Sequence, residues 1–209
     1  MRIFFFEIGF YTANTFKQRN NLVKTLIVVA HPNMQDSVIN RHLLEQAAKQ
    51  TNNFTIHNIY EAYPDWNIDV AREQALIEAH DNVILQFPIY WFNSPPLLKK
   101  WLDDVFTYGW AYGSQSHDRL KEKTIALAVT AGIRDEDYHA EGKYQYTLAE
   151  ILRPFEVTVL YINAKWGGFF GFYGTETYDE KGLTELSPEG NITDKQMTQY
   201  LEFIESINR

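Results

Sequence analysis

The residues of this sequence that could carry chemistry stand in three turns, each directly after a short apolar segment. The first turn begins at His31-Pro32 and runs to Asn40. A helix expected to start at Ser37 would point its free N–H groups and the positive end of its dipole at this turn, and both attract an anion. Ser37 and Asn40 would add side-chain donors. The turn favours a phosphate site; an ordinary helix cap for Ser37 and an ordinary strand-end residue for His31 stay open as alternatives.

The second turn, at positions 88–93, is aromatic. It contains Tyr90, Trp91 and Phe92 and follows an apolar run at 83–87. Aromatic rings and backbone donors suit a flat, redox-active ring, which needs stacking faces more than charge. The alternative is that these side chains only cover an exposed sheet end.

The third turn is Thr130-Ala131-Gly132-Ile133, after the apolar run 124–129. Glycine at position 132 lets the backbone approach a ligand closely. No single turn is specific, but the carboxyl ends of neighbouring parallel strands meet at one sheet edge. Together the three turns predict a mononucleotide pocket.

Short apolar runs alternate with segments of helical periodicity, which is typical of an α/β protein with a parallel sheet. Right-handed crossovers favour the flavodoxin-like strand order 2-1-3-4-5 in a three-layer sandwich. Ser94 is expected to cap the helix after the aromatic turn, with Pro95 as its first residue. The predicted strands are 26–30, 54–60, 83–87, 124–129 and 157–162, and the predicted helices are 37–48, 69–80, 95–105, 144–152 (stopped by Pro154) and 193–207. The inner positions expected in the 69–80 helix are Val70, Ala75, Leu76 and Ala79.

Composition limits the possible classes of protein. The chain has 209 residues, 45% of them hydrophobic, which suits one domain with a sizeable core. A net charge of −8 argues against a nucleic-acid partner, because phosphates would not be neutralised. The absence of cysteine excludes disulfides and thiolate metal sites and is compatible with the cytoplasm. No GxGxxG fingerprint is present, so a nicotinamide coenzyme would bind only transiently.

Residues 1–24 differ in character from the rest, with four basic side chains against the single acidic Glu7. We expect an N-terminal extension outside the core domain, which would cover 25–209. Three alternatives remain: a secretory signal, which Glu7 interrupts; an apolar arm formed by Phe4–Phe6; and a true start further downstream.

The chain from Thr25 to about Tyr173 resembles the flavodoxin-like NAD(P)H:quinone oxidoreductase family, which includes DT-diaphorase. It is most similar to two bacterial branches: general stress protein 14 type oxidoreductases, and ancillary subunits of glutathione-gated potassium efflux systems. The matching motifs are Ala30-His31-Pro32 with Ser37 and Asn40, Tyr63–Asp69 with Glu73-Gln74, Gln86–Trp101, Tyr108–Gly113 and Leu152–Phe155.

The resemblance implies a bound flavin, FMN with FAD as the alternative, reduced by NADPH or NADH and reoxidised by a quinone. The implied binding residues are His31, Ser37, Val38, Ile39 and Asn40 for the phosphate and ribityl chain, Ile89, Tyr90, Trp91 and Phe92 for the isoalloxazine ring, and the backbone of Thr130, Ala131, Gly132 and Ile133 for its polar edge.

Two departures from the family pattern matter. The usual Thr-Thr-Gly-Gly is here Thr130–Ile133 with alanine second and isoleucine fourth, so its second half is expected to approach the ring less closely. The family's assisting tyrosine matches Tyr138, a candidate donor to the acceptor oxygen, but the position of its histidine falls on Tyr144. His139 is a possible substitute, with a solvent-exposed loop histidine as the alternative.

The family also implies a homodimer. We expect the loop after Phe106 to roof the partner's flavin. The aromatic residues from which this dimer is argued are Trp91, Trp101, Trp110, Tyr112, Trp166, Phe169, Phe170 and Phe172. The alternative function is a flavin-binding regulatory subunit of a membrane potassium antiporter, which would place the protein at the inner face of the membrane.

Overall fold

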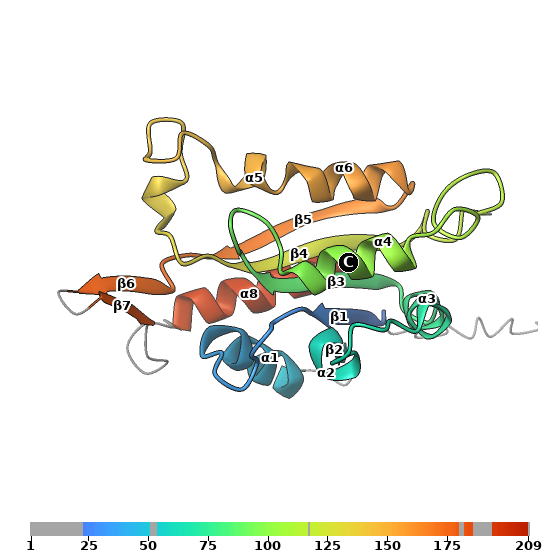
Figure 1. The fold of residues 1–209 in the computed structure, drawn as a ribbon, viewed down its shortest axis with the longest axis horizontal. Helices are drawn as coiled ribbons and strands as arrows, with labels where there is room; N and C mark the ends of the chain where they lie inside the picture. Colours follow the sequence, from blue (N-terminus) through green and yellow to red (C-terminus); the bar gives the residue numbers. More distant parts are fainter. Residues whose placement is uncertain (1–22, 51–53, 117, 180–181, 186–193, 209) are drawn as a thin grey trace, which may run out of the picture.

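Five parallel strands form one sheet with helices on both faces (Figure 1). The computed structural model describes residues 23–50, 54–116, 118–179, 182–185 and 194–208. The observed order β2-β1-β3-β4-β5 confirms the predicted topology. The strands are β1 (Thr25–Val29), β2 (Phe54–Asn58), β3 (Asn82–Pro88), β4 (Thr124–Thr130) and β5 (Lys165–Phe172).

Side chains alternate between the two faces of the sheet, and each set meets its own helices. Ile27 and Ile84, paired in register on β1 and β3, pack with α1 (Ile39–Gln50) and α8 (Asp194–Ile207). β1 and β3 are buried along their whole length, so their continuous apolar runs are those of strands covered on both faces.

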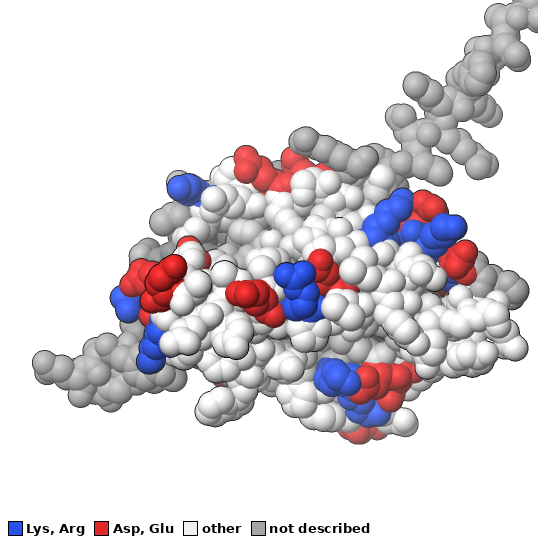
Figure 2. All heavy atoms as spheres, turned by 90° about the horizontal axis from the view of Figure 1, so that it is seen from above, with Lys and Arg blue, Asp and Glu red and all other residues white. Residues whose placement is uncertain are grey.

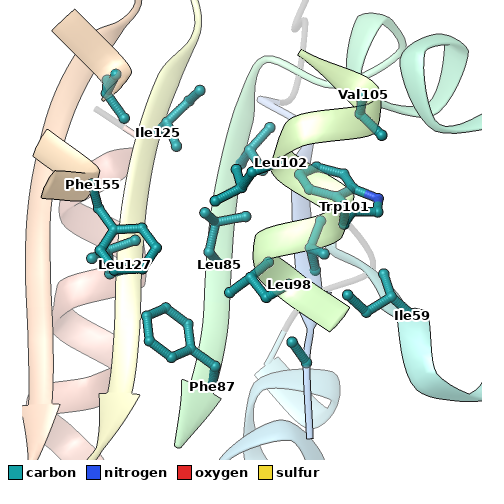
Figure 3. Close-up of a cluster of buried hydrophobic side chains, with 14 of the residues drawn as sticks. Ile59, Leu85, Phe87, Leu98, Trp101, Leu102, Val105, Ile125, Leu127 and Phe155 are labelled. Carbon is teal, nitrogen blue, oxygen red and sulfur yellow. The ribbon is translucent and has the colours of Figure 1, made fainter. Parts of the chain in front are cut away.

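The second face carries the larger core, in which Leu85 lies beside Leu98 and Leu102, whereas Phe87 and Leu127 lie toward Phe155 (Figure 3). Four of the five helices that contribute to this core follow β2 or β4 along the chain. They are α2 (Ile59–Ala62), α3 (Val70–Glu78), α4 (Pro96–Val105), α5 (Leu148–Ile151) and α6 (Arg153–Tyr161).

Three short elements complete the described fold: the 3-10 turn η1 (Asp135–Asp137) and the antiparallel hairpin of β6 (Glu176–Asp179) and β7 (Gly182–Glu185). Among the described residues, no helix has the length and apolar character needed to cross a bilayer.

The predicted fifth strand was wrong. Residues 157–162 belong mostly to α6, in which Phe155, Val159 and Ile162 are buried at helical spacing while Leu160 is 56% exposed. Pro154, expected to stop a helix, stands in the first turn of α6, where a missing N–H costs nothing.

The true fifth strand, β5, was missed because its glycines disfavour a strand on propensity alone. Gly167 lies against β4 so closely that an added Cβ would be 2.7 Å from the Thr124 Cγ2 atom. The register between β4 and β5 also shifts between Ile125 and Leu127. The close approach of β5 to β4 therefore requires glycine, the residue type that made β5 hard to predict as a strand.

Several predicted helix boundaries need correction. α4 begins at Pro96 after Pro95, so Ser94 is not its cap. α5 begins at Leu148 and not at Tyr144, because Thr147 and Glu150 form a capping box that fixes its start. β2 ends at Asn58, whose side chain caps α2 by accepting from Tyr60 N.

The inner face of α3 was also predicted wrongly. Its buried residues are Glu73 and Ile77, whereas Ala75 and Ala79 are exposed and Val70 and Leu76 are half-buried. A buried glutamate is not expected from apolar periodicity, because an uncompensated carboxylate is costly away from water.

Residues 1–22 of the predicted N-terminal extension lie outside the described residues. Lys24, at its end, is tied to the start of β3: its N–H donates to Asp81 Oδ2 at 2.8 Å, and its carbonyl accepts from Asp81 N and Asn82 N.

Candidate functional site

The carboxyl ends of β1, β3 and β4 meet at one edge of the sheet, where two adjoining cavities share Tyr90. The polar cavity has a volume of about 460 Å³. It is lined by His31, Asn33, Asp36, Ser37, Val38, Ile39, Asn40, Pro88, Tyr90, Thr130 and Thr175. The first predicted turn and Thr130 are thereby brought together.

The N-terminus of α1 opens into the polar cavity. The helix begins at Ile39, two residues after Ser37, and the first N–H groups of a helix have no partner within it. Ser37 and Asn40 are 6% and 2% exposed. No lysine or arginine lines this cavity in the described part of the chain, so an anion there would be held by neutral donors and the helix dipole.

His31 presents a defined tautomer to this cavity. Asn33 N donates to His31 Nδ1 at 3.2 Å, so the neutral ring carries its proton on Nε2 and can donate from that atom. Burial lowers the pKa of His31 below its ordinary value of 6.5. The ring is therefore a neutral donor at pH 7.

A chain of buried side chains runs beneath the polar cavity. Asn40 Nδ2 donates to Thr130 Oγ1 at 3.0 Å, Gln86 Nε2 donates to Asn40 Oδ1 at 3.2 Å, and Tyr200 donates from its hydroxyl to Gln86 Oε1 at 2.8 Å. Gln86 and Tyr200 were not predicted to belong to the site. The polar amide inside the apolar strand 83–87 was the only available signal.

The second cavity is aromatic and has a volume of about 520 Å³. It brings together the second and third predicted turns. Its lining residues are Ile89, Tyr90, Trp91, Phe92, Gly132, Ile133, Tyr138 and Tyr144.

The aromatic turn is held in a conformation that L-residues rarely adopt. Trp91 and Phe92 have φ values of 50° and 59°. Tyr90 and Asn93 close the turn through reciprocal backbone hydrogen bonds of 2.8 and 3.0 Å. Trp91 is 95% exposed, so the turn displays its ring instead of burying it. Strain of this kind concentrates at functional sites, and an exposed indole at a cavity mouth fits a binding role better than a core role.

The third turn, at positions 130–133, has few free backbone donors, because hydrogen bonds within the sheet occupy part of it. Ala131 is fully buried, and its N–H donates to Phe172 O at 2.7 Å within the sheet. The Thr130 carbonyl accepts from Ile89 N at 2.7 Å. Only Gly132 and Ile133 of this turn line the aromatic cavity.

Tyr138 lies at the inner wall of the aromatic cavity and is 2% exposed. Its ring packs between Tyr144 and Tyr173, with centroid distances of 6.2 and 5.8 Å. Tyr144 also contacts Phe92 across the cavity at 5.2 Å. His139 is exposed and does not line the cavity. Tyr144, which stands where the family pattern has a histidine, therefore lines the cavity.

A third hollow, of about 370 Å³, lies between α4 and α6. Beside it α6 exposes Val157, Leu160 and Tyr161, and Tyr108, in the loop that follows α4, is 63% exposed. Figure 2 views the molecule from the side on which α6 lies and shows charged residues in small clusters separated by broad uncharged surface.

The aromatic residues chosen for the dimer argument need correction. Trp101, Trp110 and Phe172 are buried, and Trp110 donates from Nε1 to Glu78 at 2.8 Å. Of that set only Trp91 is exposed; the others are half-buried. Val157, Leu160 and Tyr161 are exposed instead, and they lie in the part of α6 that was predicted to be a strand.

One buried carboxylate lies away from these cavities. Glu73 is fully buried and accepts from His57 Nε2 at 2.9 and 3.0 Å, from the Tyr63 hydroxyl at 2.5 Å and from Trp101 Nε1 at 2.8 Å. Burial raises its pKa, but the three donors outweigh burial, so the pKa is below the ordinary value of 4.5. The described residues contain no cluster of histidine and acidic side chains that could hold a metal ion.

Comparisons with known proteins agree with this architecture. An uncharacterized NAD(P)H oxidoreductase, YrkL, of Bacillus subtilis is 44% identical over 153 residues, 73% of this chain and 87% of that protein. The potassium-efflux system ancillary protein KefG of Cronobacter sakazakii is 37% identical over 178 residues, 85% and 94% of the two chains.

A solved structure is also similar: general stress protein 14 of Treponema denticola, in complex with FMN. It has a TM-score of 0.77 and 44% sequence identity, and the match covers 88% of this chain and 99% of that one. The model of the family described as having a flavodoxin-like fold matches residues 23–187. With its strand order and the cavities at the carboxyl ends of β1, β3 and β4, the chain belongs to the flavodoxin-like fold family.

Proposed function

We propose that this protein is an FMN-dependent NAD(P)H oxidoreductase that passes two electrons to a small flat acceptor of the quinone type. The observation that carries the proposal is the pair of adjoining cavities, one polar at a helix N-terminus and one aromatic, which share Tyr90. A flavin mononucleotide has the same division into a charged phosphate end and a flat ring. The FMN complex of the Treponema relative supports FMN over FAD.

The polar cavity suits the phosphate and ribityl chain. Ser37, Asn40 and the free N–H groups at the start of α1 would bind phosphate oxygens, and His31 Nε2 would add a neutral donor. Ile89 to Phe92 and Gly132-Ile133 would line the ring. The bound flavin would supply the hydride chemistry; the protein binds, orients and excludes water.

Tyr138 is the proposed donor to the acceptor oxygen, because it is the buried hydroxyl-bearing side chain in the aromatic wall. Tyr144, and not His139, completes this wall beside Phe92. NADH or NADPH and then the acceptor would occupy the same open face of the aromatic cavity in turn.

The test of the proposal begins with purified protein. We expect a flavin absorption spectrum, FMN on chromatography of the released cofactor, and NAD(P)H oxidation that depends on an added quinone. The double variant Ser37→Ala with Asn40→Ala should weaken FMN binding at least about tenfold, because it removes donors to a charged group.

The matched control is Ser206→Ala, which removes an exposed hydroxyl on α8 that bonds only its own helix. FMN affinity should be unchanged in this variant. Unchanged affinity in the folded double variant would place the phosphate elsewhere and contradict the proposal.

We further propose that the working form is a homodimer. The exposed apolar side chains of α6 and Tyr108 beside the hollow at α4 support this, because contiguous apolar surface usually marks association. Leu160→Glu should shift the protein toward monomers in light scattering across a dilution series. Ile56→Glu is the control, since Ile56 is 42% exposed on β2 at the opposite sheet edge. Dimers of equal strength in both variants would contradict an interface at α6.

The second candidate function is a flavin-binding subunit of a potassium-efflux system. The specific observation in its favour is the 37% identity to the KefG relative over 85% of this chain. Co-purification with a membrane antiporter and poor quinone turnover by the isolated protein would favour this candidate. Efficient turnover without a partner would favour the enzyme.

A further inference from the structure

We propose that Tyr200, Gln86 and Asn40 form a buried relay of hydrogen bonds whose effect is to make the Thr130 hydroxyl a donor into the polar cavity. Tyr200 and Gln86 are positioning residues. Asn40 uses one N–H to position Thr130 and keeps the other for the phosphate, and the Thr130 hydroxyl is the further group that would touch the ligand. The inference rests on the proposed function, because the acceptor it requires is an oxygen atom of a bound flavin nucleotide.

The direction of the relay follows from one group whose role is unambiguous. Gln86 Nε2 lies 3.4 Å from the backbone carbonyl of Asn40, which can only accept. The Gln86 amide must therefore present its NH₂ to Asn40 and its Oε1 to Tyr200. The Tyr200 hydroxyl, 2.8 Å from Gln86 Oε1, must then donate.

The same logic passes the orientation on to Asn40. Asn40 Oδ1 accepts from Gln86 Nε2 at 3.2 Å, so the Asn40 NH₂ faces Thr130. Thr130 Oγ1 accepts this NH₂ at 3.0 Å. A hydroxyl has a single proton, and the relay does not consume the one on Thr130. That proton remains available for donation, and Thr130 lines the polar cavity.

Burial makes this orientation stable. Tyr200 and Gln86 are fully buried, Asn40 is 2% exposed and Thr130 is 5% exposed. Water cannot compete for these groups, and reversing any one amide would place two donors or two acceptors face to face at a cost of several hydrogen bonds. The relay thus joins α8, β3, α1 and β4, and it ends at the cavity where a ligand oxygen would accept.

The first test removes the final donor. Thr130→Val has almost the same shape but no hydroxyl, and should raise the FMN dissociation constant about tenfold, whereas Thr130→Ser should stay within about threefold of the unmodified protein. The loss of an acceptor for Asn40 affects the free and the FMN-bound protein alike, so it cancels in the affinity. Thr124→Val, at the other end of the same strand, is the matched control and should bind FMN normally.

The second test removes the first donor. Tyr200 does not line the polar cavity. Tyr200→Phe removes the hydroxyl that fixes the orientation of the Gln86 amide, and should raise the FMN dissociation constant about three- to tenfold. Tyr63→Phe deletes another buried tyrosine hydroxyl, the one that donates to Glu73, and should leave FMN affinity unchanged. Thermal unfolding of all variants reports whether they fold.

A double-mutant cycle decides between the relay and a general loss of structure. If Tyr200 acts through Thr130, Tyr200→Phe should change FMN affinity less than about twofold in the Thr130→Val protein. If the two substitutions raise the FMN dissociation constant by independent factors that multiply, the relay is overturned. Normal FMN binding by folded Thr130→Val would overturn it as well. This second result is decisive even if Tyr200→Phe fails to fold. A wild-type protein that binds no FMN would instead overturn the proposed function.

Discussion

The two buried polar networks of this protein differ in charge and in closure. The Glu73 network contains a carboxylate whose oxygens receive three donors, from His57, Tyr63 and Trp101, and it ends there. The relay from Tyr200 is neutral throughout and ends at Thr130 in the wall of a cavity. A network that is closed on itself can contribute only stability and positioning, whereas one that is open at a cavity can also serve a ligand. The comparison predicts that substitutions in the first act on folding and substitutions in the second act on binding.

The largest effect is expected from Glu73→Ala. Removal of the carboxylate leaves the three donors buried without an acceptor, which should lower the free energy of unfolding by about 3–5 kcal/mol. Urea denaturation measures this loss, and FMN affinity of the folded fraction should stay the same. If Glu73→Ala lost much of its FMN affinity but kept its stability, the Glu73 network would act on binding and not on folding, which would contradict the comparison.

A smaller effect should appear in acid. The pKa of Glu73 is lowered in the folded state, so its contribution is present above the unfolded pKa and is lost as pH falls through the folded value, below 4.5. In Glu73→Gln this contribution is absent. The stability gap between the unmodified protein and the variant should therefore narrow on acidification below pH 4.5, as followed by urea denaturation at several pH values. A gap that stays constant would mean that Glu73 does not titrate with folding.

Substitutions of His31 test whether the polar cavity binds its ligand through neutral donors. Because burial lowers its pKa, the ring should stay neutral above pH 6.5 and act only as a donor. His31→Gln keeps a neutral donor and should bind FMN within about threefold of the unmodified protein, while His31→Ala should lose up to about tenfold. Isothermal titration from pH 6.5 to 8 provides the comparison. Binding that strengthens toward low pH only when His31 is present would show that the charged ring is used.

The smallest effect is expected from deletion of residues 1–22. The described members of both networks all lie outside this segment, and the predicted core domain begins at Thr25. Thermal stability, FMN content and the dimer should be nearly unchanged. Loss of folding or of assembly would identify Phe4–Phe6 as an integral apolar arm.

Much of the architecture could be predicted because local pattern and global fold agree. The continuous apolar runs of β1, β3 and β4 can be satisfied only in a sheet covered on both faces, and their turns necessarily meet at one edge. The prediction failed at 157–172, where a β-branched segment forms α6 and a glycine-rich segment forms β5. There the packing of Gly167 against β4 outweighs propensity, and no local rule contains that contact.

The sequence by itself determined the sheet order, because right-handed crossovers leave few topologies for alternating strands and helices. It also determined the three turns and the residue types that face the candidate ligand, because these depend on neighbours along the chain. Only the tertiary structure decided that Glu73 is buried, that Trp110 is covered and that Tyr200 lies beneath the polar cavity. Tyr200 and Gln86 are 114 positions apart, and Gln86 and Asn40 are 46 apart. The direction of a hydrogen bond between such residues depends on how both elements dock on the sheet, which the periodicity of either element alone does not encode.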